Sequence, residues 1–170
     1  YTATHYSGHS EQVLENFVGG SDDPAISANG RYVVFASDAS NLVAGDHNDS
    51  VQFIGAEYHS MIDGYAYWQE YRTDFGRDIF RKDLSTGAIE RVSTTSSGQE
   101  VYNSDSWSPS ISADGRYVAF VSTGSLVGDD RNNCSDVFVK DTLSGIVVRV
   151  SSGDNGQDGN GPSSDPSLSA

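Results

Sequence analysis

The stretch of sequence that decides the fold is residues 108–122, which read SPSISADGRYVAFVS. Its second half, residues 116–121, is rich in the β-branched and aromatic residues that favour strands. Ahead of it lies Asp114-Gly115, a dipeptide favoured in two-residue hairpin turns of type I′, whose two central residues both need positive φ. The stretch therefore predicts two short antiparallel strands joined by a tight turn.

The same pattern occurs three times along the chain. A second copy, DPAISANGRYVVFAS, occupies residues 23–37, and a third, DPSLSA, occupies residues 165–170. The downstream halves also match, since DIFRKD and RVS at 78–83 and 91–93 correspond to DVFVKD and RVS at 136–141 and 149–151. Each unit thus predicts four short antiparallel strands, which is typical of a blade in an all-β propeller.

These motifs resemble the TolB-like (WD40-like) β-propeller repeat of bacterial proteins. The resemblance rests on PSISADGRYVAF, DVFVKD and RVS in order, and it covers nearly the whole chain. It implies a β-propeller that is extracellular, at the cell surface or periplasmic. It also favours a role as a scaffold or interaction module.

The repeat divides the chain into five parts. Residues 1–23 are expected to form the last strand of a preceding blade and a connecting loop, and residues 152–170 a loop and the first strand of a following blade. Between them, we expect a first blade at 24–94, a linker loop at 95–108 and a second blade at 109–151. Two blades cannot close a ring. Other copies of the chain, in a ring or a surface filament, or the rest of a longer chain would have to complete it.

Charge and hydropathy limit the classes of partner. The 24 acidic residues outnumber the 10 basic ones, giving a net charge of −14. Such a surface repels phosphate backbones, which argues against nucleic-acid binding. No apolar stretch is long enough to span a bilayer.

An aromatic-rich insertion lengthens the first unit at about residues 51–75. Insertions into repeats lie on one face, often the binding face. The functional interpretation is a glycan- or protein-binding surface, and the alternative is a lid that packs on its own blade or on a neighbouring subunit. The residues predicted to form the surface are Tyr58, Tyr65, Tyr67, Trp68 and Tyr71.

Each unit also carries a polar loop with oxygen-bearing side chains at Asp-x-Asn spacing. Several hard oxygen ligands in a flexible loop favour Ca²⁺, whereas the alternative is an Asx-turn, in which Asp or Asn bonds its own backbone. The predicted calcium ligands are Asp130, Asn132 and Asp136 in the second unit and Asp46, Asn48 and Asp78 in the first.

The sequence thus predicts a calcium-stabilised, non-enzymatic scaffold outside the cytoplasm. One alternative is a glycan- or protein-binding module that uses the aromatic insertion. The other is the propeller portion of a larger secreted hydrolase, although the chain shows no nucleophile elbow.

Overall fold

A computed structural model describes residues 20–46, 49–61 and 64–169, and for residues 49–61 and 64–75 it describes the backbone alone. The described residues contain ten strands and no helix, so no helix among them could cross a membrane. The strands are β1 (Ser21–Ile26), β2 (Tyr32–Ser37), β3 (Asp49–Met61), β4 (Gly64–Phe75), β5 (Asp78–Asp83), β6 (Ile89–Arg91), β7 (Ser106–Ile111), β8 (Tyr117–Ser122), β9 (Asp136–Asp141) and β10 (Val147–Arg149).

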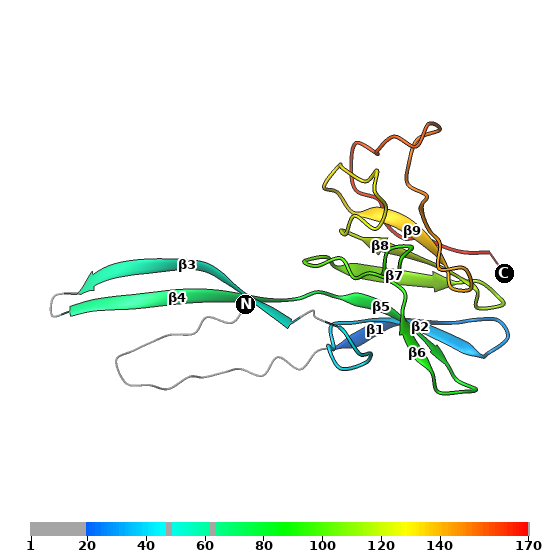
Figure 1. Cartoon of the computed structure of the whole chain (residues 1–170), viewed down its shortest axis with the longest axis horizontal. Helices are drawn as coiled ribbons and strands as arrows, with labels where there is room; N and C mark the ends of the chain where they lie inside the picture. Colours follow the sequence, from blue (N-terminus) through cyan, green and yellow to red (C-terminus); the bar gives the residue numbers. More distant parts are fainter. Residues whose placement is uncertain (1–19, 47–48, 62–63, 170) are drawn as a thin grey trace.

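The repeat units form two four-stranded antiparallel sheets. The first sheet has the order β1-β2-β5-β6 and the second the order β7-β8-β9-β10. The all-β prediction is therefore confirmed. The two sheets lie beside each other, and among the described residues they do not close a ring (Figure 1).

The hydrophobic core lies between the two sheets. Alternation along each strand sends one set of side chains to this side. Val34, Ala36 and Ile79 of the first sheet are fully buried there against Phe120 and Phe138 of the second. The core cluster also contains Val92, Val118, Leu126 and Val147. The sheets thus share a single core.

The turn between the first two strands of each sheet differs from the type I′ prediction. Only the glycine has positive φ, 68° at Gly30 and 79° at Gly115, and Asn29 and Asp114 do not. The physical reason is the side chain before the glycine. Asn29 Oδ1 accepts hydrogen bonds from the Arg31 amide at 2.9 Å and the Ser27 hydroxyl at 2.7 Å, which holds a longer loop. Asp114 makes the same two contacts in the second sheet.

A bulge distorts the first strand of each sheet at the residue before proline. Asp23 and Ser108 have φ values of 50° and 51°, and the pairing of β1 with β2 and of β7 with β8 shifts register there. Asp165 in the third copy has a φ of 54°, although no strand is assigned there. That segment lies beside β7, where the Leu168 amide donates to Ser110 Oγ at 3.0 Å. The third copy thus keeps the local shape of a first strand.

The insertion is a long β-hairpin. Strands β3 and β4 pair from Asp49↔Phe75 to Met61↔Gly64, and the hairpin extends away from the two sheets (Figure 1). The five aromatic residues predicted to form a binding surface all lie in these strands, with Tyr58 opposite Tyr67 in the register.

Candidate functional site: two buried arginine–carboxylate clusters

The polar residues marked by the sequence gather around an arginine that ends the last strand of each sheet. In the second sheet this is Arg149, whose side chain is only 3% exposed. Its Nη1 lies 3.3 Å from Asp130, 3.7 Å from Asp136 and 2.5 Å from Asp158. Its Nη2 also donates to the carbonyl of Gly156 at 3.3 Å. We call these four charged residues the second cluster.

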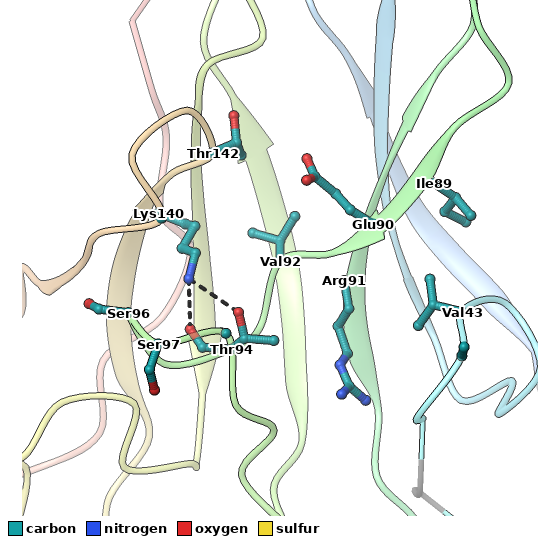
Figure 2. Close-up of a pocket in the computed structure, with 13 residues that line it drawn as sticks. Val43, Ile89, Glu90, Arg91, Val92, Thr94, Ser96, Ser97, Lys140 and Thr142 are labelled. Atoms are coloured by element: carbon teal, nitrogen blue, oxygen red, sulfur yellow. Dashed lines mark hydrogen bonds between the residues drawn. The ribbon is translucent and has the colours of Figure 1, made fainter.

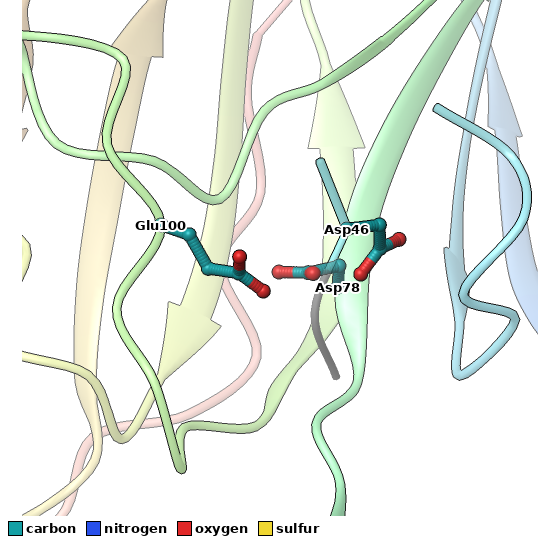
Figure 3. A group of neighbouring side chains, drawn as sticks. All are labelled: Asp46, Asp78 and Glu100. Carbon is teal, nitrogen blue, oxygen red and sulfur yellow. The ribbon is translucent and has the colours of Figure 1, made fainter. Parts of the chain in front are cut away.

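The first sheet has a matching group, which we call the first cluster. Nη1 of Arg91 lies 3.3 Å from both Asp46 and Asp78 and 2.9 Å from Glu100. The side chains of all four residues are at most 9% exposed. The carboxylates of Asp46, Asp78 and Glu100 come from three separate segments and converge on one point (Figure 3).

Strand register and one serine explain why the central aspartate of each cluster is buried. Asp78 and Asp136 begin β5 and β9, beside the strands that carry Arg91 and Arg149. Ser93 Oγ donates to Asp78 at 2.5 Å and accepts the Ile79 amide at 3.0 Å. Ser151 repeats both contacts, at 2.6 Å to Asp136 and 2.9 Å from the Val137 amide. The RVS motif therefore supplies both the cation and the hydroxyl that fix the aspartate.

The structure brings the aspartates among the predicted calcium ligands together, but not the side-chain oxygen of Asn132. Asp130 and Asp136 share one arginine, as do Asp46 and Asp78 despite the intervening hairpin. The side-chain oxygen of Asn132 is not directed at the cluster, because Oδ1 accepts a hydrogen bond from the Cys134 amide at 2.8 Å in an Asx-turn. Asn132 Nδ2 donates to Asp136 at 3.1 Å and to the Gly159 carbonyl at 3.3 Å. Asn48 lies outside the described residues.

Three cluster residues were not predicted as site residues, namely Arg91, Glu100 and Arg149. Asp158 lies in the acidic loop 153–161, for which the sequence allows either a cation site or a linker. A signal for the two acids exists. Glu100 and Asp158 both follow a glutamine, and each lies the same number of residues after the arginine of its own RVS motif. The third acid of each cluster therefore lies at an equivalent position beyond the RVS motif.

Electrostatics make the second cluster crowded with negative charge. Burial raises the pKa of Asp130, and the nearby charge of Asp136 raises it further. Three carboxylates surround one guanidinium in each cluster. In the first cluster, oxygens of Asp46, Asp78 and Glu100 lie within 4.8 Å of one another, so the oxygen set is chemically suited to a divalent cation.

Each sheet also carries an exposed arginine–aspartate pair. Arg116 contacts Asp141 at 2.7 Å and Arg31 contacts Asp83 at 2.7 Å. The guanidinium of Arg116 holds the pKa of Asp141 well below its usual range. These pairs join the residue after the glycine turn to the end of the third strand, so they tie the same two places in both sheets.

A cleft of about 510 Å³ opens between the two sheets. Lys140 lies at its side and is only 6% exposed (Figure 2). Its Nζ donates to the Thr94 carbonyl at 3.2 Å, to Thr94 Oγ1 at 3.1 Å and to the Thr95 carbonyl at 2.8 Å. An ammonium has three protons, and these three acceptors satisfy them. Lys140 therefore ties the second sheet to the segment after β6.

No protein-family model and no curated protein matches this chain. The resemblance to the TolB-like repeat accordingly stays a prediction from the motifs.

Proposed function

We propose that the chain is a non-enzymatic structural module, a pair of β-propeller blades that serves as an extracytoplasmic scaffold. The observation that carries this proposal is the duplicated cluster. The same arginine, serine and three acids occur at equivalent places in both sheets. A group that recurs in each repeat suits a role that every repeat needs, which is to hold its own strands and loops together.

The chemistry of the clusters supports the same conclusion. A catalytic acid or base needs access to a substrate, whereas the side chains of Asp136 and Arg149 are 0% and 3% exposed. Each is engaged in hydrogen bonds or ion pairs with its own chain. Each cluster joins the start of the third strand of its sheet to the end of the fourth strand and to two flanking loops, and so it would hold these parts in place.

Hydrogen exchange tests this proposal directly. The amides of Ile79 and Val137 are bonded to the cluster serines, so we expect them to exchange only in the slowest class. Arg91→Met should speed exchange at Ile79, and Arg149→Met should speed it at Val137. The matched control is Arg116→Met, which removes an exposed pair and should leave both amides protected. Unchanged protection in the two cluster variants would argue against a bracing role.

We propose calcium as an additional stabiliser of these clusters, because three carboxylates face one guanidinium in each. A divalent cation would bind carboxylate oxygens and reduce their mutual repulsion. Acidic loops of this kind also suit compartments with millimolar calcium. We expect Ca²⁺ to raise the melting temperature of the chain and a chelator to lower it. A melting temperature that is the same with Ca²⁺ and with chelator would refute this.

A second candidate function is recognition of a glycan or protein by the β3–β4 hairpin. It is favoured by the projection of this hairpin away from the sheets (Figure 1) and by the five aromatic residues in it that were predicted to form a binding surface. Replacing residues 49–75 by a short turn should abolish binding on a glycan array and leave the far-ultraviolet spectrum of the sheets in place. Glycan binding that survives the replacement would exclude this siting.

A further inference from the structure

The contact between the two sheets is made by a defined face of the second sheet. Val118, Phe120, Phe138 and Val147 pack on the first sheet, and Lys140 reaches the carbonyls of Thr94 and Thr95. The Val147 amide also donates to Ser96 Oγ at 2.9 Å. We call this contact the internal interface, and Figure 2 shows the hydrogen bonds of Lys140 to Thr94 beside the cleft.

The first sheet carries the same face on its other side, pointing away from the second sheet. The register equates Phe35 and Phe80 with Phe120 and Phe138, and both pairs of rings interact, at 5.8 Å and 6.1 Å between centroids. Phe80 is already fully buried in the chain itself, so the exposed residues of this face are Lys82 and Leu84. Lys82 is the equivalent of Lys140, yet Lys82 is exposed whereas Lys140 is buried. We call this the head face.

The second sheet carries the complementary surface on its own outer side. Ile146, Val148 and Val150 alternate along β10 and its flanks and are 55%, 52% and 51% exposed. Val150 is the equivalent of Val92, which the internal interface buries to 1%. We call this the tail face. An exposed apolar stripe of this kind is typical of an interaction surface.

The turn that follows the tail face has the geometry that receives Lys140 in the internal interface. In the turn after β6, the Gly98 amide donates to the Thr95 carbonyl at 2.9 Å. In the equivalent turn after β10, the Gly156 amide donates to the Gly153 carbonyl at 2.8 Å. Ser152 and Gly153 are therefore the equivalents of Thr94 and Thr95, whose carbonyls accept hydrogen bonds from Lys140. The acidic side chain of Asp154 replaces Ser96 and complements the charge of Lys82.

Two positions that face each other across the internal interface carry different side chains on the outer faces, and both differ in the same way. In the internal interface, Glu90 and Thr142 line the same cleft (Figure 2). Their equivalents on the outer faces are Val148 and Leu84, which are 52% and 53% exposed. A polar pair is thus replaced by an apolar pair, with both members changed together. This is what two surfaces that cover each other require.

We propose that the tail face of one copy of this chain docks on the head face of a second copy. The inference rests on the proposed scaffold function and names the partner of that scaffold. Because the two faces are different surfaces of one chain, the contact is head-to-tail, and it leads to a ring or a filament. The net charge of −14 opposes association at long range, so assembly should strengthen as added salt screens it.

One segment of the chain competes with docking. Residues 163–169 lie beside β7, in the place that β1 of a docked sheet would take, and Leu168 is held there by Ser110 Oγ. The Ser163 amide adds one bond, at 2.8 Å to the Ser135 carbonyl. Docking must displace this segment. Ser110→Ala, which removes the first bond, should therefore tighten self-association.

The test uses two full-length variants with one defective face each. Leu84→Glu places a charge on the head face, and Val148→Glu places one on the tail face. We expect sedimentation velocity to show concentration-dependent assembly of the unmodified chain and at least about tenfold weaker assembly of each variant alone. Mixed together, the variants should form dimers that grow no further, since only one pair of intact faces remains. Leu143→Glu, at a 78% exposed turn position outside both faces, is the matched control.

The outcomes separate this proposal from the scaffold function. An unmodified chain that stays monomeric at every concentration and salt level overturns the docking proposal but not the bracing role, which hydrogen exchange measures in the monomer. Assembly that both variants retain also overturns it, as does a mixture without dimers. Equal melting temperatures of the variants and the unmodified chain exclude misfolding as the cause of lost assembly.

Discussion

Replacing Arg149 by methionine should be among the most damaging single changes to the second sheet. The side chains of Arg149, Asp130 and Asp136 are 3%, 5% and 0% exposed, so removing the guanidinium leaves two carboxylates inside the protein without their cation. Breaking a buried ion pair from one side costs about 3–5 kcal/mol. In a chain of this size, each kcal/mol lowers the melting temperature by about 2–4 °C, so we expect a fall of roughly 6–20 °C.

The assay is thermal unfolding followed by circular dichroism at neutral and at acid pH. Buried carboxyls without a cation take up protons more readily, so the deficit of Arg149→Met should shrink as the pH falls. Arg91→Met should behave in the same way, because the first cluster has the same construction. Arg116→Met is the control, since its guanidinium is 41% exposed and solvent screens its pair. Equal deficits for Arg149→Met and Arg116→Met would refute the reasoning.

Three further predictions concern single positions. Gly30→Ala and Gly115→Ala should each lower the free energy of unfolding by about 1–2 kcal/mol, because both glycines have positive φ. Gly115→Ala should cost more, because its new Cβ would clash with the Tyr32 ring, whereas nothing lies within 4 Å at Gly30. Equal losses of unfolding free energy in urea would contradict this. Burial lowers the pKa of Lys140 below 10.5, so the unfolded chain binds more protons in the alkaline range just below that value. Stability should therefore rise with pH in that range, and less so in Lys140→Met; parallel curves for the two proteins would be the contrary result. Asn132→Asp replaces an amide donor to Asp136 with a fourth carboxylate beside Asp130, Asp136 and Asp158, so it should lower the melting temperature in chelator and make the melting temperature more sensitive to Ca²⁺. A variant as stable as the parent would show that this amide contributes little.

The strands could be predicted from the sequence because the repeat states the same information twice. The RYVVF and RYVAF segments contain most of β2 and β8, and the DIFRKD and DVFVKD segments are β5 and β9. Each pair has apolar residues at matching positions. The turn type could not be predicted from the Asn-Gly and Asp-Gly dipeptides alone. Its geometry depends on the serine two residues earlier, whose hydroxyl bonds the Asn29 or Asp114 side chain.

The candidate site was found from the sequence only in part, for a physical reason. Oxygen side chains at short spacing indicate a cation, and both Asp130 and Asp136 do face one. Sequence spacing does not say whether that cation is a metal ion or an arginine from another strand. Arg149 lies beyond Asp136 in the chain and meets it because β9 and β10 pair. The partner is therefore set by strand pairing, which local spacing does not reveal.

The place where the β3–β4 hairpin leaves the first sheet makes this repeat tolerant of new loops. Ser37 and Asp78, which flank the insertion, are opposite each other in the ladder, as Ser122 and Asp136 are in the second sheet. The sheet itself therefore closes the loop, whatever the loop contains. Lengthening the segment from residues 123–135 to residues 38–77, roughly threefold, adds only about 1 kcal/mol of closure entropy. Such a site is a natural graft point, at which a repeat can exchange its projecting arm while its strands, turns and braces stay unchanged.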